Sequence, residues 1–258
     1  MGLNSFLDDI RTAVNRIIND KASFQKINTI PDTIPLEGNH WLELDEVTCV
    51  FVDMIGSTQM HLRDQDAVKV YEIFIKSLVK ILNTYGAQYI DIKGDGAFGI
   101  FSGNESAIPA LCSAVTFRTV CSKILENKFT DFHIKTHIGM DTDRVLVKRI
   151  GLRGDKNNEV WVGKPVNIAS KLASLAPESF IYASDRTYQT LLKKDYMRYL
   201  IKSCGCPDGV SMDLWTKEDN THAFLKLQSF YSLGSCWCAI HGEEFCGAVM
   251  DIYRQRNS

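Results

Sequence analysis

A short apolar run that ends on a carboxylate constrains the fold of this chain more than any other feature. Residues 47–53 read VTCVFVD, which is almost entirely apolar or β-branched. Such a run, followed closely by Gly56 and Ser57, predicts a buried strand that ends in a turn. A carboxylate at the end of a buried strand, such as that of Asp53, costs free energy unless it is paired or bound to a metal ion. The run therefore predicts a core sheet with a polar site at its end.

A second acidic side chain falls at the predicted tip of a hairpin. Residues 88–92 and 97–101 are predicted strands, and the turn between them, 93–96, reads KGDG. The glycines beside Asp95 would let the main chain approach a bulky anion. Two aspartates brought together form the hard-oxygen site that Mg²⁺ or Mn²⁺ shares with phosphate. Taken singly, each aspartate could equally be an ordinary capping or turn residue.

The rest of the pattern predicts an α+β fold. The order β-α-β-β-α-β-β-β-α-β-α indicates helices packed on a largely antiparallel sheet. Further strands are expected at 133–140, 144–150, 160–162 and 180–183, and helices at 66–85, 105–127, from 163 and from 184. Residues 3–19 predict an amphipathic helix whose apolar face needs either the body or a second copy as its partner. Residues 28–45 are expected to form an extended linker.

Three segments together resemble a known family. FVDMIGST (51–58), IKGDGAFGIF (92–101) and GKPVNIASKLASLA (163–176) resemble, in order and spacing, the motifs of class III nucleotidyl cyclases. The resemblance covers about residues 45–195. It implies a ferredoxin-like sandwich that converts a nucleoside triphosphate into a 3′,5′-cyclic monophosphate. We expect an N-terminal helix and linker (1–44), a catalytic domain (45–198) and a Cys/His-rich extension (199–258).

The site residues of that family can be carried over position by position. Asp53 and Asp95 match its two metal-binding aspartates, which hold two Mg²⁺ or Mn²⁺ ions per site, and the main chain of Ile55 would add a ligand. Asn167 matches the asparagine that orients the ribose, and Lys171 stands where the family usually has an arginine for the α-phosphate. Other expected substrate contacts are Met54, Gly56, Ser57, Thr58 and Gly94.

The family also implies a dimer. Its aspartates come from one subunit and its asparagine and arginine from the other, so a homodimer would contain two sites. Asn167 and Lys171 are four residues apart and share a helix face; without the motif they would be read as a solvated face. Lysine keeps the positive charge of arginine but lacks its planar fork, so bidentate phosphate binding is not available.

The positions that read the base match neither purine pattern. Asp91 stands where adenylate cyclases usually carry lysine and guanylate cyclases glutamate, and Val160 where adenylate cyclases often have aspartate. A carboxylate at 91 would accept hydrogen bonds from uracil, cytosine or guanine, and also from the amino group of adenine. Trp161 and Tyr89 would narrow the pocket in favour of a smaller base.

These positions resemble the anti-phage pyrimidine cyclases of the Pycsar type. Those enzymes make cyclic UMP or cyclic CMP, which a separate effector reads, and we favour UTP over CTP. An adenylate or guanylate cyclase, and a catalytically dead nucleotide-binding module, stay as alternatives. A diguanylate cyclase is set aside because no GGDEF-like run occurs.

The C-terminal cysteines have two interpretations. A structural Zn²⁺ could use ligands among Cys204, Cys206, Cys236, Cys238, His241 and Cys246. The C-x-C spacings differ from the common C-x₂-C zinc pattern, so small buried hydrophobes are the alternative. Cys49, Cys112 and Cys121 are expected in the core.

Composition and charge narrow the partners. The net charge is −2, with 29 basic and 31 acidic residues, which does not suggest nucleic-acid binding. No apolar run approaches the roughly 18 residues of a membrane span, and no signal peptide is recognised at the N-terminus. We therefore expect a cytoplasmic protein with reduced thiols.

Overall fold

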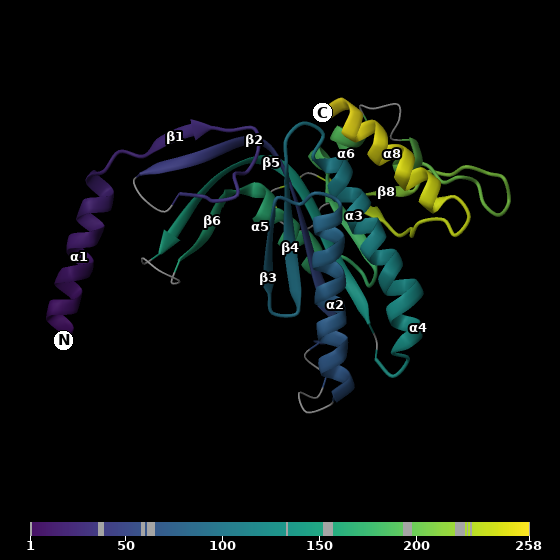
Figure 1. The fold of residues 1–258 in the computed structure, drawn as a ribbon, viewed down its shortest axis with the longest axis horizontal. Coiled ribbons are helices and arrows are strands. Elements are labelled where there is room, and N and C mark those ends of the chain that lie inside the picture. Colours follow the sequence, from purple (N-terminus) through teal and green to yellow (C-terminus); the bar gives the residue numbers. More distant parts are fainter. Residues whose placement is uncertain are drawn as a thin grey trace.

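A mixed sheet forms the centre of the protein (Figure 1). The computed structural model describes residues 2–35, 39–57, 60, 65–132, 134–151, 157–192, 198–219, 225, 227 and 229–257. The sheet order is β3-β4-β2-β5-β7-β9-β8, with β1 beside β2 and β6 beside β5. The strands are β1 (Ser23–Lys26), β2 (His40–Ile55), β3 (Tyr89–Lys93), β4 (Gly96–Ser102), β5 (Lys135–Gly151), β6 (Asn157–Gly163), β7 (Phe180–Ser184), β8 (Trp215–Asp219) and β9 (Ser229–Leu233).

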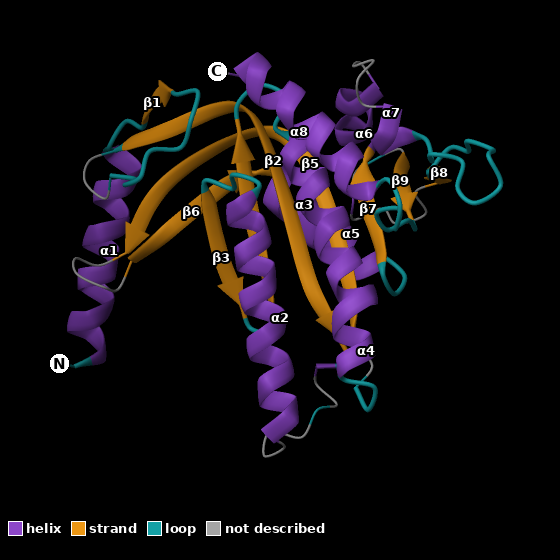
Figure 2. Ribbon diagram, turned by 45° about the vertical axis from the view of Figure 1, so that its right-hand side comes forward, coloured by secondary structure: helices purple, strands orange, loops and turns teal. Residues whose placement is uncertain are grey.

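Most strand pairs are antiparallel, and β1–β2 and β5–β7 are parallel. Helices cover both faces of the sheet (Figure 2). They are α1 (Leu3–Asn19), α2 (Gln65–Thr84), α3 (Ala107–Val120), which continues through a π-helical turn (Cys121–Leu125) into α4 (Glu126–Lys128), α5 (Lys164–Leu175), α6 (Asp185–Leu192), α7 (Arg198–Ile201) and α8 (Gly242–Asn257). The predicted α+β sandwich with an antiparallel-dominated sheet is confirmed.

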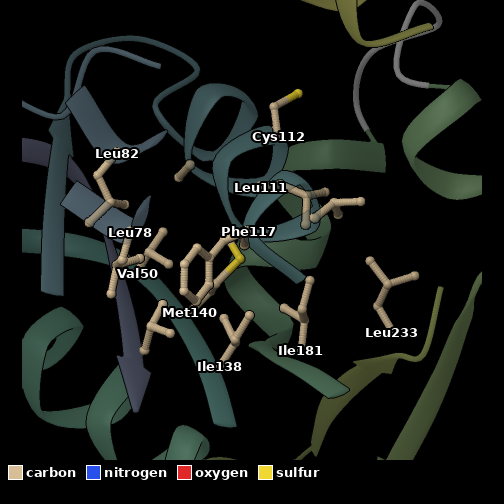
Figure 3. Packing of buried hydrophobic residues seen from close by; sticks show 14 of the residues in the cluster. Val50, Leu78, Leu82, Leu111, Cys112, Phe117, Ile138, Met140, Ile181 and Leu233 are labelled. Carbon is tan, nitrogen blue, oxygen red and sulfur yellow. The ribbon is translucent and has the colours of Figure 1, made fainter. Parts of the chain in front are cut away.

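The main core lies between the sheet and helices α2 and α3 (Figure 3). Val50 and Ile138 from the sheet pack with Leu78 of α2 and Phe117 of α3, and all four are fully buried. The rings of Phe74 and Phe117 meet edge to face at 5.0 Å, a favoured aromatic geometry. The predicted core cysteines Cys49, Cys112 and Cys121 are all buried.

The helical stretch Ala107–Lys128 corrects the expectation that no apolar segment has the length of a membrane span. By length and composition alone this helix could cross a membrane. Its most apolar part is 61% buried inside the protein, because it packs between the sheet, α2 and α8. Its apolar character therefore follows from its place in the core.

Helix α5 lies on the opposite face of the sheet and rests directly on β5. A Cβ atom at Gly139 would collide with the main chain of Ala169 and Ala173, so glycine allows the close approach. The buried face of α5 includes Ile168, Ala169 and Leu172, which leaves its other side turned away from the sheet. This contact fixes the position of α5 along the direction of β5.

Strand β5 is one continuous strand where two paired strands were predicted. The polar run Asp141-Thr142-Asp143 has the composition of a turn, but it lies inside the strand. Arg186 explains why: its Nε donates to Asp141 at 2.7 Å and its terminal nitrogen to Asp143 at 2.6 Å. The ion pairs offset the cost of placing carboxylates within a sheet.

The two ends of the chain are also more ordered than expected. Strand β2 begins at His40, so it crosses the predicted boundary between residues 44 and 45, and β1 was not predicted. Strands β8 and β9 join the sheet beside β7, and α8 packs on α3. Residues after 199 therefore complete the same sheet.

Candidate active site

The two predicted metal-binding aspartates lie side by side. Asp53 is half-buried near the end of β2, and Asp95 is half-buried in the turn between β3 and β4. Burial raises the pKa of Asp53, and the nearby negative charge of Asp95 raises it further. The main-chain N–H of Met54, which donates to Asp53, and His137 act in the opposite direction. The structure thus concentrates negative charge at one point.

The turn around these carboxylates is tightly built. A Cβ atom at Gly96 would lie 2.8 Å from Oδ1 of Asp53 and would collide with the carbonyl of Val52, so only glycine fits. Ser57 Oγ donates to the Asp95 carboxylate. Tyr71 of α2 donates from its hydroxyl to the carbonyl of Ser57 at 2.9 Å. Gly96 and Ser57 therefore contact the two aspartates directly, and Tyr71 holds Ser57 in place.

The residues that follow Asp53 occupy the turn as expected. The Met54 side chain is buried in the core, so only its main chain is available to a ligand. Ile55 and Gly56 are half-buried, and Gly94 is exposed at the hairpin tip. Thr58 lies outside the described residues. Paired carboxylates with main-chain carbonyls nearby are the donors that Mg²⁺ and Mn²⁺ prefer, so the residues present fit a divalent ion.

Asn167 lies on the other side of the α5–β5 crossing from the aspartates within one chain. Asn167 is exposed near the start of α5, where its amide donates to the carbonyl of Gly163 at 3.1 Å. It lies about one turn, or 6 Å, before the level at which α5 crosses β5. Asp53 lies two residues beyond that crossing in the other direction, about 7 Å. Measured along the helix and then along the strand, Asn167 and Asp53 of one chain are therefore about 13 Å apart.

Three of the four residues around the expected base position come together. The rings of Tyr89 and Trp161 are 5.1 Å apart, and Asp91 shares the Tyr89 face of β3. Asp91 forms an ion pair with Lys93 at 2.6 Å, and its side chain is only 17% exposed. Burial, then the charges of Asp91 and Glu159, raise the pKa of Tyr89.

Trp161 and Val160 differ in an informative way. The indole Nε1 of Trp161 is buried, and a hydrogen bond from this side chain to Tyr89 lowers the pKa of the Tyr89 hydroxyl against the effect of burial. Val160 is 38% exposed and lies on the opposite face of β6 from Trp161. Val160 therefore lies apart from the Tyr89–Trp161 pair in a single chain, and its role as the second base-reading position stays a prediction.

The six C-terminal zinc candidates divide into two groups. Cys204, Cys206, Cys238 and His241 come together. Cys236 instead accepts a hydrogen bond from Arg118 at 3.1 Å, and Cys246 lies 3.0 Å from the Tyr85 hydroxyl. Four of the six candidate ligands therefore come together, and contacts with α3 and α2 hold Cys236 and Cys246 elsewhere.

Two supporting residues were missed by sequence reasoning. Tyr71 holds the turn after β2, and His137 pairs with Asp53 across the β2–β5 ladder. His137 Nδ1 is also bonded to the carbonyl of Ala176 at 2.7 Å, which links β5 to the end of α5. Tyr71 falls on the predicted helix 66–85, but nothing in its spacing marks it as a partner of Ser57.

Comparison with known proteins identifies the family to which the chain is similar. Residues 41–205 match the family model of the adenylate and guanylate cyclase catalytic domain. A uridylate cyclase from Propioniciclava tarda is 30% identical, and the match covers 99% of this chain and 86% of that protein. A uridylate cyclase from Micromonospora echinofusca is 28% identical over 87% of this chain and 75% of its own length.

Solved structures agree on the fold. The adenylyl cyclase CyaB from P. aeruginosa superposes with a TM-score of 0.61 at 18% identity, covering 75% of this chain and 95% of that one. A sheet that brings two aspartates together at a strand end and a hairpin turn is the arrangement of a class III cyclase, and this chain belongs to the adenylate and guanylate cyclase catalytic-domain family. It is a nucleotidyl cyclase, a phosphorus–oxygen lyase.

Proposed function

We propose that this protein is a uridylate cyclase, which converts UTP into cyclic UMP and pyrophosphate. The observation that carries the proposal is the position of the largely buried Asp91 carboxylate on the same strand face as Tyr89, whose ring lies against the indole of Trp161. Uracil offers an N3–H donor between two carbonyl acceptors. A carboxylate and an indole N–H therefore complement it, and the ring of Tyr89 provides an apolar wall. The two relatives named uridylate cyclase support the same substrate.

The reaction forms one bond and breaks another at the α-phosphorus. The ribose O3′ gives its proton to solvent water and bonds to the α-phosphorus, while the bond from that phosphorus to the pyrophosphate oxygen breaks and pyrophosphate leaves. Asp53 and Asp95 would hold two Mg²⁺ or Mn²⁺ ions, which supply Lewis-acid activation of O3′ and neutralise phosphate charge. Asn167 orients the ribose, and Lys171 places its ammonium group against the α-phosphate.

The proposal requires two copies of the chain. Because Asn167 and Asp53 of one chain lie on opposite sides of the α5–β5 crossing, about 13 Å apart along the helix and the strand, one copy does not complete the site. In a two-fold dimer the aspartates of one copy meet Asn167 and Lys171 of the other, and the second site forms by symmetry.

Helix α1 supports the same assembly. None of its residues is buried, and it projects away from the sheet (Figures 1 and 2). Its apolar residues are 46–74% exposed: Leu3, Phe6, Leu7, Ile10, Val14, Ile17 and Ile18. An isolated helix of this length is only marginally stable in water. Because the body leaves this face uncovered, we assign it to the second copy.

The proposed product is a messenger that a separate effector reads. The likeness to the anti-phage pyrimidine cyclases supports production of this messenger in response to infection. The use of a nucleoside triphosphate as substrate supports a cytoplasmic location. Cyclic UMP is expected to rise in cells that carry the enzyme after phage infection. An equal level in uninfected cells would contradict the defence role.

CTP is the second candidate substrate. Asp91 would also accept a hydrogen bond from the amino group of cytosine. The N3 atom of cytosine is an acceptor, however, and would face the carboxylate without a proton between them. This mismatch at a buried polar contact favours UTP.

Product identification tests the assignment directly. The purified protein is incubated with ATP, GTP, CTP and UTP in separate reactions with Mn²⁺, and products are identified by mass spectrometry. The blank is the Asp53→Ala, Asp95→Ala double variant, and the matched control is Asp251→Ala, which changes an exposed aspartate on α8. We expect cyclic UMP from the wild type and the control only. A purine product would overturn the uridylate assignment, and no product at all would favour a dead or phage-activated cyclase.

A further inference from the structure

Four metal-binding side chains converge in the C-terminal region, away from the two aspartates. One ligand atom from each of Cys204, Cys206, Cys238 and His241 lies within 4.8 Å of all the others. The group lies between α7 and α8, and three of its members line a cavity of about 220 Å³ together with Phe245. The proposed cyclase chemistry uses none of these residues.

The local main chain places the first two ligands on the same side. Cys204 and Cys206 flank Gly205, which has a φ of +87°. A Cβ atom at position 205 would lie 2.9 Å from the main chain of Gly209, so a larger residue does not fit there. Glycine thus permits the tight turn that points both thiols toward one point.

A second turn places the other two ligands. The N–H of Gly242 donates to the carbonyl of Cys238 at 2.9 Å, which closes a turn that ends in His241 at the start of α8. The ring of His241 stacks with that of Phe245, and Phe245 stacks on Tyr199. These contacts fix the imidazole so that Nδ1 faces the thiols.

The distances agree with a tetrahedral metal site. With Zn–S near 2.3 Å and Zn–N near 2.0–2.1 Å, a tetrahedron has sulfur–nitrogen edges of about 3.6 Å. Nδ1 of His241 lies 3.4 Å from Sγ of Cys206 and 4.0 Å from Sγ of Cys238. The N–H of Ile240 points at the Cys238 sulfur at 3.4 Å, the kind of second contact that stabilises a bound thiolate.

We propose that Cys204, Cys206, Cys238 and His241 bind one structural zinc ion. Three thiolates and one imidazole are soft ligands that select zinc over the Mg²⁺ or Mn²⁺ of a carboxylate site. Four protein ligands leave no open position, so the ion has a structural role. The ion would join two segments that lie more than 30 residues apart in the sequence. The second segment is anchored on α3 by a hydrogen bond from Trp237 Nε1 to the Thr116 hydroxyl at 2.8 Å.

The metal content of the full chain tests the proposal. The protein is dialysed against EDTA to remove weakly held ions, and zinc is measured by mass spectrometry. We expect about one zinc per chain in the wild type and almost none in Cys206→Ser or His241→Ala. The matched control is Cys236→Ser, which removes a neighbouring thiol outside the group and keeps its zinc. The Asp53→Ala variant also keeps it, which separates this site from the catalytic metals.

A spectroscopic measurement keeps the proposal testable if the variants fold poorly. The wild-type protein is grown with Co²⁺ in place of zinc. A tetrahedral thiolate site gives intense visible d–d bands and thiolate-to-cobalt charge transfer. Absence of these bands, zinc retained in Cys206→Ser, or a disulfide within the group in freshly isolated protein would each overturn the assignment.

Discussion

At the residue scale, the site depends on the carboxylate of Asp53, whose ionised form is unfavourable in the metal-free protein. Its carboxylate is half-buried beside Asp95, and both conditions favour protonation, so its pKa is raised. A divalent ion reverses this preference because it binds the ionised form. The same pair that repels in the free enzyme thus becomes a ligand set when a metal is bound.

The first prediction follows from that pKa. Because the folded pKa is raised, the metal-free contribution of Asp53 to stability is present at low pH and lost as pH rises through the folded pKa. Stabilisation by Mn²⁺ has the opposite sign and should grow as pH rises. Thermal unfolding with and without Mn²⁺ measures both.

Asp53→Asn is the matched variant for this experiment, since it keeps the shape and removes the charge. It should lose most of the Mn²⁺ stabilisation and its dependence on pH. A shift by Mn²⁺ that is equal at all pH values in the wild type would contradict the role of this carboxylate as a ligand.

The second prediction concerns Asp91 and the choice of base. In Asp91→Asn an amide replaces the carboxylate and can donate to the N3 of cytosine. We expect the ratio of kcat/KM for UTP over CTP to fall about tenfold, because one mispaired polar contact is worth roughly 1–3 kcal/mol.

Trp161→Phe provides the complementary test, because it keeps the ring and removes the N–H. UTP turnover should fall while the protein stays folded. If both variants keep the wild-type substrate ratio, the base is read elsewhere.

At the scale of elements, the continuity of strand β5 depends on an ion pair with helix α6. Asp141 is fully buried within the strand and is neutralised by Arg186 of α6. We predict that Arg186→Ala lowers the free energy of unfolding by about 3–5 kcal/mol, because it leaves a buried carboxylate unpaired. Urea unfolding measures this.

The matched control for Arg186 is Arg254→Ala, which breaks an exposed ion pair with Asp251. Its loss should be below about 1 kcal/mol. If both variants lose a similar free energy of unfolding, the ion pair of Arg186 with Asp141 is not what keeps β5 continuous.

Helix α1 gives the second prediction at this scale. Replacing Phe6, Ile10 and Val14 by glutamate should weaken the proposed dimer more than tenfold, since each apolar side chain contributes up to about 1.5–3 kcal/mol on burial. Sedimentation measures the dissociation constant.

The matched control changes the polar side of α1, with Asp9→Ala and Arg16→Ala, and should leave the dimer intact. The fold of the body should be the same in both variants, because none of the residues of α1 is buried in one chain. An unchanged dissociation constant in the glutamate variant would remove α1 from the interface.

At the scale of the whole molecule, the shared site makes a complementation test available. Asp53→Ala and Asn167→Ala should each be inactive as homodimers. A mixture re-assembled after dissociation contains heterodimers with one native site, so about a quarter of wild-type activity should return. Without recovery, the two residues do not act across a two-fold interface.

The sequence by itself determined the local parts of this protein. The apolar run of residues 47–53 and the glycines around Asp95 act over a few residues, so the strand and the hairpin could be predicted from them. The three motifs predicted the cyclase family, and the comparisons confirm it. The aspartate pair followed because both of its members lie within those motifs.

Contacts between distant residues were decided only by the tertiary structure. Arg186 keeps Asp141 inside a strand that the composition divides in two, and packing on the core selects four zinc candidates out of six. The strand alternation of β6 turns Val160 away from Trp161. Each outcome depends on which side chains meet across the sheet or between helices, and the free energy of such contacts is set by burial and pairing in three dimensions.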